Sequence, residues 1–230
     1  MQKAVVNKYI QYNPCENVVL PKRRKPETHA YSLEQIKTML ERSKDDIALQ
    51  TIIGLGALAG LRRGEIAALT TDCIILSDNV NELRIRENIV KCDGTVYRKD
   101  TKTENSIRNI PIPNILVDIL KRALHDYMLR KFKYGEEFKD KDGQLLCLDD
   151  GRFRDPQNIY KLYMRFLKEQ TDLPRYTLHS LRHSYASIMI DLGINAKIVQ
   201  ECLGHSSIQT TLNTYTHSFK RSKQFRGIKA

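Results

Sequence analysis

The sequence predicts a mixed fold that is mainly α-helical and contains one small antiparallel β-sheet. Apolar residues recur at helical spacing on both sides of residues 73–112, and that central stretch holds short β-rich runs separated by Asp-Asn and Asp-Gly turns. The chain has 230 residues, of which 41% are hydrophobic and 28% are charged. It is therefore long enough and apolar enough to bury a core without disulfides or a structural metal.

The expected helices are placed by their caps and by the period of their apolar residues. Residues 32–35 read Ser-Leu-Glu-Gln, which fits a capping box, and apolar residues follow at helical spacing. A second helix, from 45 to about 59, is apolar nearly all round and is expected at the centre of the core. Helical patterns return at about 113–133, 156–170, 177–192 and 195–203, the last two ending at Gly193 and Gly204.

The expected strands come from four β-rich runs between residues 73 and 112, which read CIIL, ELRIRENIV, TVYRK and IRNIPI. Turn residues separate them at short range. We therefore expect them to pair as a single antiparallel sheet.

Three parts are expected along the chain. Residues 1–27 end in prolines and a Lys-Arg-Arg-Lys run, which indicates the last piece of a preceding unit followed by an exposed basic linker. A compact domain is expected over residues 28–217, followed by a basic tail over 218–230.

The net charge of +11 favours a polyanionic partner, because neutralising phosphates releases counterions. Residues 1–26 and 216–230 supply ten of these charges, and residues 84–108 and 151–182 are also basic.

No apolar run has membrane-spanning length and the N-terminus has no signal-peptide pattern. The five cysteines are scattered without metal-binding or redox spacing. We expect a cytoplasmic protein without a membrane partner.

Four segments carry residues suited to chemistry, and each has an ordinary structural interpretation when taken alone. Arg62 fits a solvated side chain, His179 and Arg182 fit a hydrogen-bonded pair on one helix face, and His205 fits a helix-end cation. Tyr215 fits a packed core tyrosine. The segments are GLRRGEIAALT at 60–70, DTKTENSIRNIPI at 100–112, TLHSLRHSYA at 177–186 and LGHSSIQTTLNTYTH at 203–217.

Taken together and in this order, the four segments resemble the catalytic domain of the tyrosine recombinases, or phage integrases. The likeness runs from about residue 10 to residue 217 and includes the context of Arg62, His-x-x-Arg at 179–182, Leu-Gly-His at 203–205 and Tyr-Thr-His at 215–217. The resemblance implies the tyrosine recombinase catalytic-domain fold. It also implies that residues 1–27 are the end of a core-binding domain with its linker, and that 28–217 are the catalytic domain.

The chemistry of phosphodiester transfer calls for these residue types. The transition state gathers negative charge on the non-bridging oxygens, and an arginine stays charged and binds two oxygens in a fork. Arg62 and Arg182 are therefore expected to clamp the phosphate, with His205 as a further donor.

Tyr215 is the expected nucleophile, and its attack would give a 3′-phosphotyrosine bond that conserves the energy of the broken phosphodiester. His179 is the candidate base for the tyrosine proton. Lys102 resembles the lysine that the family uses as the acid for the 5′ oxygen, and Lys99 is its nearby competitor. No cofactor or metal motif is visible, which agrees with cofactor-free and metal-free transfer.

Three further roles are expected around this set. Glu65 lies one helical turn after Arg62, where the family orients its cations with an acid, although a surface carboxylate at a helix start fits equally well. His183 is expected to be structural or to contact the DNA backbone. Lys99 and Arg108, in the basic stretch, are also expected to bind DNA.

The resemblance also implies partners and leaves alternatives open. It implies that the substrate is double-stranded DNA at attachment sites, where four protomers exchange strands through a Holliday junction. It also implies that the basic tail crosses to a neighbouring protomer or lies on DNA, and that accessory DNA-bending or directionality factors take part. Tyr215 follows His205 by ten residues, whereas many members have nine. This spacing is similar to that of integrases of conjugative transposons and Gram-positive phages. The alternatives are a type IB topoisomerase-like relaxing enzyme and a non-catalytic DNA-binding module.

Overall fold

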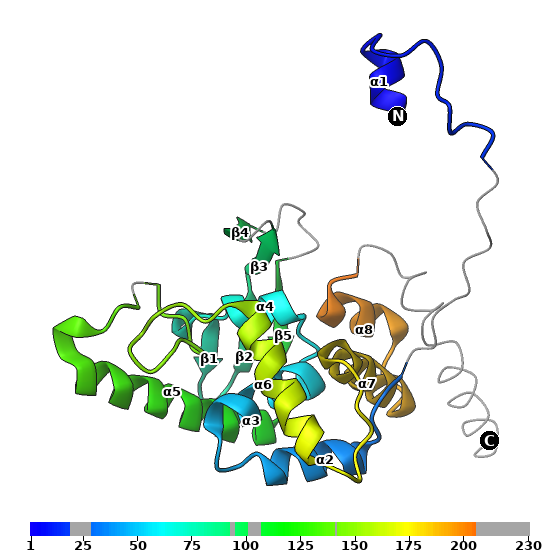
Figure 1. Ribbon diagram of the computed structural model, residues 1–230. Coiled ribbons are helices and arrows are strands. Elements are labelled where there is room, and N and C mark those ends of the chain that lie inside the picture. Colours follow the sequence, from blue (N-terminus) through cyan, green and yellow to red (C-terminus); the bar gives the residue numbers. More distant parts are fainter. Residues whose placement is uncertain (19–28, 93–94, 101–106, 141, 206–230) are drawn as a thin grey trace, which may run out of the picture.

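The computed structural model describes residues 1–18, 29–92, 95–100, 107–140 and 142–205. Its helices are α1 (Gln2–Val6), α2 (Leu33–Arg42), α3 (Ile47–Leu58), α4 (Arg63–Ala68), α5 (Asn114–Tyr134), α6 (Pro156–Glu169), α7 (Leu178–Asp191) and α8 (Ala196–Leu203), with short 3-10 turns η1 (Thr71–Cys73) and η3 (Gly135–Glu137). Helix α5 extends to one side of the molecule and α7 and α8 lie at the other, with α3, α4 and α6 between them (Figure 1). The predicted fold class, mainly α-helical with a small amount of antiparallel β-structure, is confirmed.

Helix α3 forms the centre of the core, as its apolar sequence predicts. It packs against both α5 and α7. Its glycines permit this close approach, since a Cβ on Gly54 would lie 3.0 Å from the Leu116 side chain and a Cβ on Gly56 would lie 3.0 Å from that of Leu181. The helix that carries His179 and Arg182 is thereby fixed directly against the centre of the molecule.

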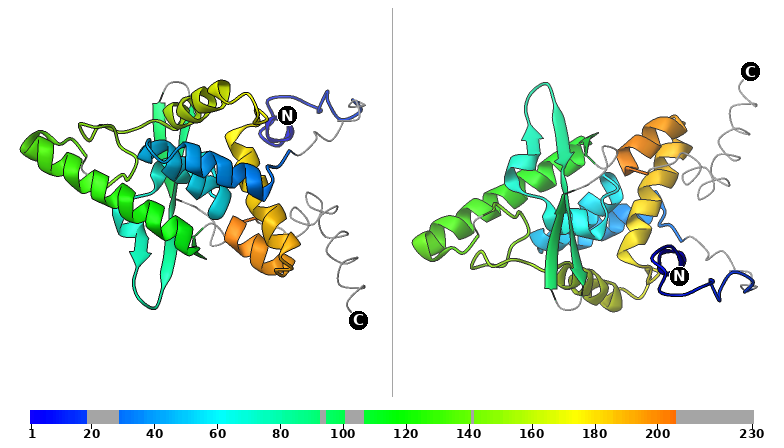
Figure 2. Two further views of the ribbon diagram at one scale, coloured as in Figure 1. Left: turned by 90° about the horizontal axis from the view of Figure 1, so that it is seen from below. Right: turned by 90° about the horizontal axis from the view of Figure 1, so that it is seen from above.

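The strands are β1 (Ile74–Leu76), β2 (Asn81–Ile85), β3 (Glu87–Cys92), β4 (Thr95–Asp100) and β5 (Arg108–Pro111). They form a narrow layer across the middle of the molecule in both views of Figure 2. Strands β1, β2 and β5 pair antiparallel in that order, with Leu83 opposite both Ile74 and Ile110, and β3 pairs with β4 in a separate two-stranded ribbon.

The expectation of a single sheet was wrong, because the run at 82–90 is divided at the exposed Arg86. Strand β2 already has a partner on each edge, so the chain beyond Arg86 pairs with β4 instead. Strand β3 also packs against α4, where a Cβ on Gly64 would lie 2.4 Å from the carbonyl oxygen of Ile89. The base of the ribbon therefore lies against the first turn of α4, next to Arg62.

Within the described ranges, no helix is both long enough and apolar enough to cross a membrane.

Candidate active site

Arg62 is placed by a left-handed turn at the end of α3. Gly60 has a φ of +66°, and a Cβ at this position would lie 2.5 Å from the Tyr185 ring, so both the backbone and the packing require glycine. The turn makes Arg62 the N-cap of α4, and its backbone N–H donates to Oε2 of Glu65 at 2.8 Å. One helix end thus fixes the backbone of Arg62 relative to the Glu65 carboxylate.

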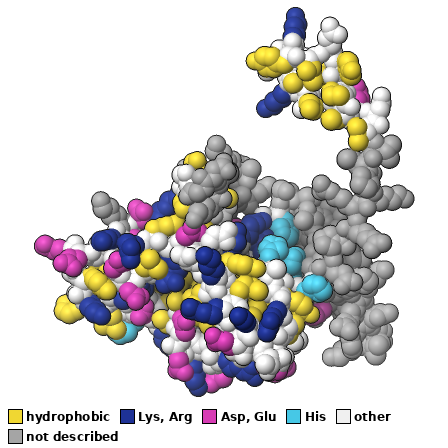
Figure 3. All heavy atoms as spheres, in the orientation of Figure 1, with side chains coloured by type: hydrophobic (Ala, Val, Ile, Leu, Met, Phe, Trp, Pro, Cys, Tyr) yellow, Lys and Arg dark blue, Asp and Glu magenta, His cyan; other side chains and the backbone are white. Residues whose placement is uncertain are grey.

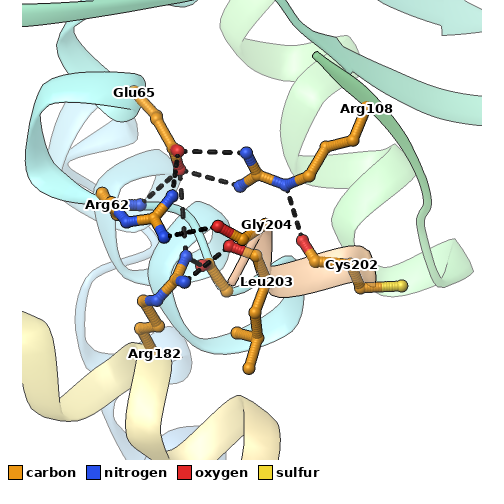
Figure 4. A network of polar contacts seen from close by, with 8 residues as sticks. Arg62, Glu65, Arg108, Arg182, Cys202, Leu203 and Gly204 are labelled. Atoms are coloured by element: carbon orange, nitrogen blue, oxygen red, sulfur yellow. Dashed lines mark hydrogen bonds and ion pairs between the residues drawn. The ribbon is translucent and has the colours of Figure 1, made fainter. Parts of the chain in front are cut away.

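Glu65 is a buried carboxylate surrounded by three arginines (Figure 4). Its Oε1 accepts from Nη1 of Arg62 at 2.7 Å and from Nη1 of Arg108 at 3.0 Å, and its Oε2 accepts from Nη2 of Arg108 at 2.9 Å. Nη1 of Arg182 lies 3.9 Å from Oε2. The carboxylate is therefore the common counter-ion of all three guanidinium groups.

The pKa of Glu65 reflects this environment. Burial acts to raise it, but hydrogen bonding and charge from Arg108, followed by the charges of Arg62 and Arg182, outweigh burial and lower the pKa to about 2. Glu65 consequently stays ionised throughout the neutral range.

Arg182 connects two distant chain segments. It lies on α7 and its side chain is only 2% exposed. Nη1 donates to the carbonyl of Gly60 at 2.7 Å and Nη2 donates to the carbonyl of Leu203 at 2.6 Å. The Arg62 side chain is 35% exposed, so it is the more accessible of the two predicted clamp residues.

The end of α8 presents three successive carbonyl groups, and each accepts from a different arginine (Figure 4). Cys202 O accepts from Nε of Arg108 at 2.7 Å, Leu203 O from Arg182, and Gly204 O from Nη2 of Arg62 at 2.9 Å. The last carbonyls of a helix have no partner within it and carry partial negative charge. Guanidinium groups therefore satisfy and neutralise this end while being held in fixed positions.

His205 follows directly from this turn. Gly204 is left-handed with φ 63° and ψ 46°, which ends α8, and the backbone of His205 is fixed by hydrogen bonds with Gln200. Desolvation, followed by the charges of Arg182 and Arg62, lowers the pKa of the half-buried His205 to about 4. At neutral pH the imidazole is uncharged and still carries one N–H donor.

His179 and His183 lie one turn apart on α7, with ring centroids 4.6 Å apart in an edge-to-face arrangement. His179 is exposed, and partial desolvation together with the charges of Arg182 and Arg62 lowers its pKa. Desolvation, followed by the charges of His179 and Arg182, lowers the pKa of His183 to about 4. His179 is thus neutral at pH 7 and able to accept a proton.

An open pocket lies beside these groups, and Arg62 and His179 both contribute to its wall. Arg63, Asn88 and Gln157 also line it. Histidine side chains gather on one face of the molecule beside lysine and arginine side chains (Figure 3). The pocket combines the cation of Arg62 with the neutral imidazole of His179 and is suited to binding a phosphate.

The structure brings together Arg62, Glu65, His179, Arg182 and His205, from segments up to 143 residues apart. Two predicted residues, Lys102 and Tyr215, lie outside the described residues. Lys99 lies on β4, opposite Asn88 of β3. Among the described residues, no group of three or more His, Cys, Asp or Glu side chains is arranged to hold a metal ion.

Arg108 has a different place from the one expected of a DNA contact. Its side chain is 6% exposed and its three nitrogens bind Glu65 and Cys202 in the interior. The expectation is corrected because the buried carboxylate attracts this cation inward. A signal was present in the sequence, since Arg108 alternates with exposed Asn109 on β5 and shares the buried face with Ile110.

Comparison with known proteins agrees with these features. The sequence profile of the Phage integrase family matches residues 28–222. A XerC-like tyrosine recombinase of Caldanaerobacter subterraneus is 31% identical over 235 residues, covering 96% of this chain and 60% of that protein. Transposase A from transposon Tn554 of Staphylococcus aureus is 30% identical over 207 residues, covering 88% of this chain and 52% of the transposase. The chain thus spans between half and three fifths of the length of these relatives.

Solved structures show the same fold. The Tn1549 transposon integrase in complex with transposon right end DNA has a TM-score of 0.73 and 20% identity, covering 98% of this chain and 74% of that chain. XerA recombinase has a TM-score of 0.65 and 22% identity, covering 98% and 73% of the two chains. With the family profile matching most of its length, this chain belongs to the phage integrase family, the tyrosine recombinases.

Proposed function

We propose that this chain carries the catalytic centre of a site-specific DNA recombinase. The observation that carries the proposal is the convergence of Arg62 and Arg182 on one helix end, directly before His205 and around the buried Glu65. Such preorganised donors stabilise the charge that develops on a phosphoryl group in the transition state without rearranging during the reaction.

In the proposed reaction, Oη of Tyr215 attacks the scissile phosphorus. A 3′-phosphotyrosine bond forms as the bond from phosphorus to the 5′ oxygen breaks. His179 accepts the tyrosine proton, which its lowered pKa permits, and Lys102 gives a proton to the leaving 5′ oxygen. A 5′ hydroxyl of the partner strand then attacks the phosphotyrosine, restores the phosphodiester and releases Tyr215.

The proposal extends to organisation and partners. Residues 1–27 are the end of a core-binding domain with its linker, 28–217 are the catalytic domain and 218–230 are a basic tail. The family match, which begins at residue 28, supports the proposed start of the catalytic domain. The substrate is double-stranded DNA at attachment sites, bound by four protomers with accessory bending or directionality factors, in a bacterial cytoplasm. The transposon, phage and conjugative-element names of the relatives support a mobile-element substrate.

A nicked suicide substrate tests the proposal. The full chain is incubated with nicked duplex DNA that spans the flanks of its own gene, and denaturing gels are scanned for a protein–DNA adduct. We expect an adduct at a defined position, absent in Tyr215→Phe. Adducts at many unrelated positions would favour a relaxing enzyme, and specific binding without any adduct would favour a binding module.

A further inference from the structure

We propose that Arg108 is a positioning residue for this reaction: it holds Glu65 and the end of α8 in place, and they in turn hold Arg62 and Arg182. The inference rests on the proposed function, because it concerns the same phosphate clamp. Nothing in the recombinase motifs of the sequence assigns this role to Arg108.

All three guanidinium nitrogens of Arg108 are engaged in the interior. Nη1 and Nη2 bind the two oxygens of Glu65 at 3.0 Å and 2.9 Å, and Nε binds the carbonyl of Cys202 at 2.7 Å. The fork thus connects α4 to α8, while Arg108 itself belongs to β5. A bidentate fork fixes direction as well as distance, which a lysine cannot do.

Each of these contacts of Arg108 lies one step from a clamp arginine. Glu65 binds both the backbone N–H and Nη1 of Arg62. The Cys202 carbonyl directly precedes those of Leu203 and Gly204, which hold Arg182 and Arg62. A displacement of Arg108 therefore reaches the clamp by two routes.

Arg108 also packs closely against the turn before His205. A Cβ on Gly204 would lie 3.0 Å from Nη1 of Arg108 and 3.3 Å from its Cδ. The guanidinium is therefore in contact with the turn, as well as hydrogen-bonded to the residue before it.

Removing Arg108 should also change the ionisation of Glu65. Burial acts to raise the pKa of this carboxylate, and Arg108 provides the largest opposing effect. Among the described residues, the other charged or titratable groups around Glu65 include Arg62 at the N-cap of α4 and Arg182 and His179 of α7. Asp72, Arg84, Arg86 and Glu87 lie around an adjoining small cavity. Without Arg108 the pKa rises, so Glu65 takes up a proton and releases Arg62 at a higher pH.

Arg108→Met tests the proposal, with Arg130→Met as the matched control. Arg130 is a mostly buried arginine of α5 that likewise binds a carboxylate, Asp126, and the carbonyls of Cys147 and Leu148, and none of these contacts involves Glu65 or the end of α8. The variants of this whole chain are compared for DNA affinity at several salt concentrations and for the cleavage rate at saturating protein over a range of pH.

We expect Arg108→Met to bind DNA within about twofold of wild type with the same salt dependence, and to cleave at least about tenfold more slowly, as when a transition-state contact is weakened. The fall in its cleavage rate at acidic pH should begin at a higher pH, because protonation of Glu65 is then added to that of His179. Arg108→Lys should bring the pH at which the rate falls part of the way back to that of wild type, since it keeps the charge. It should not recover the full cleavage rate. Arg130→Met should cleave at the wild-type rate once folded.

Two outcomes would overturn the proposal. In the first, Arg108→Met binds DNA more weakly, the slope of log affinity against log salt concentration falls by about one, and the cleavage rate at saturating protein is unchanged. That result would mean that Arg108 contacts a DNA phosphate. Equal rate losses in Arg108→Met and Arg130→Met, without a moved acid limb, would leave only a structural role. If Arg108→Met does not fold, the pH profile of Arg108→Lys decides.

Failure of the proposed function can be recognised separately. If wild type forms no adduct, the guanidinium proton signals of Arg62 and Arg182 are followed by NMR in the free chain. Positioning by Arg108 predicts slow exchange of these protons in wild type and faster exchange in folded Arg108→Lys. Unchanged exchange would reject the proposal whatever the chain does to DNA.

Discussion

Arg62 donates a hydrogen bond from Nη2 to the carbonyl oxygen of Gly204, 142 residues further along the chain, at 2.9 Å. The contact joins the start of α4 to the turn that leads into His205. Because the two preceding carbonyls also bind arginines, the C-terminal end of α8 works as a template for the cations around it. The conformation of this turn should therefore control catalysis even though its backbone has no chemical role.

Gly204→Ala should lower both stability and the cleavage rate. The left-handed conformation disfavours alanine by roughly 1–2 kcal/mol, and the new Cβ would lie 3.0 Å from Nη1 of Arg108. We expect a lower midpoint in urea unfolding and, in protein that remains folded, slower formation of the phosphotyrosine adduct.

Gly135→Ala provides a control for the loss of stability. Gly135 also has a positive φ, +53°, at the end of α5, although its ψ of −126° lies outside the left-handed region of Gly204, and a Cβ there meets no atom within 4 Å. It should lose stability and keep its cleavage rate. An equal loss of rate in both variants would mean that the template acts only through overall stability.

Arg62→Ala should lose far more cleavage rate than DNA affinity. A donor to the transition state contributes on the order of 100-fold to the rate, whereas ground-state binding is spread over many phosphates. Arg63→Ala is the comparison, because Arg63 is exposed, lines the same pocket and has no hydrogen bond to Glu65. We expect Arg63→Ala to lose more DNA affinity than cleavage rate, as measured by filter binding and single-turnover cleavage. If Arg62→Ala cleaves at the wild-type rate once it is bound to DNA, Arg62 is not part of the clamp.

Local sequence patterns were sufficient for the longer helices. The capping box at Ser32 is present, and α5, α6, α7 and α8 begin and end within about one residue of the predicted positions. These features depend on neighbours within a few residues. The arginines and histidines were identified by resemblance to a family, since their spacing alone does not show that they meet.

What the sequence left open depended on contacts between distant segments. Glu65 fitted a surface carboxylate at a helix start as well as an acid that orients the cations, and its burial becomes clear only from distant partners such as Arg108 of β5 and Arg182 of α7. The division of the strands at Arg86 likewise depends on β2 having partners on both edges. Charge clustering suggested that Arg108 binds DNA, but it carries no information about which side chains turn inward.

Glu65→Gln should remove part of the acid sensitivity of the fold. The pKa of Glu65 is about 2 in the folded chain and 4.5 ordinarily, so its ionised form contributes stability that is complete above pH 4.5 and lost as the pH falls towards 2. That contribution is on the order of 3 kcal/mol. The variant should be less stable at pH 6, and its urea midpoint should fall less between pH 6 and pH 3.

Glu137→Gln, at an exposed site in η3, is the control and should show the wild-type pH dependence. A Glu65→Gln chain whose midpoint falls as steeply as that of wild type would show that other carboxylates carry the acid sensitivity.

Protonation of His179 should make the cleavage rate fall at acidic pH, in a limb of the pH profile that begins below the ordinary histidine pKa of 6.5. Its pKa is lowered by desolvation and then by the charges of Arg182 and Arg62, so the neutral base persists as pH falls through 6.5. The apparent second-order rate of adduct formation, which reports groups of the free enzyme, should stay level to below pH 6.5 and then decline. His179→Gln should be slower and lack this limb. A limb that persists in His179→Gln belongs to another group.

Lys102→Ala should cleave ordinary DNA slowly and recover on DNA with a sulfur at the 5′-bridging position of the scissile phosphate. A thiolate leaves without a proton because thiols are far stronger acids than alcohols, so a missing general acid no longer limits the rate. Lys99→Ala is the matched variant, from β4 only three residues earlier, and should show no selective recovery. Adduct formation on the two substrates gives the comparison. Recovery by Lys99→Ala alone would transfer the acid role to Lys99, and recovery by neither would remove both lysines from it.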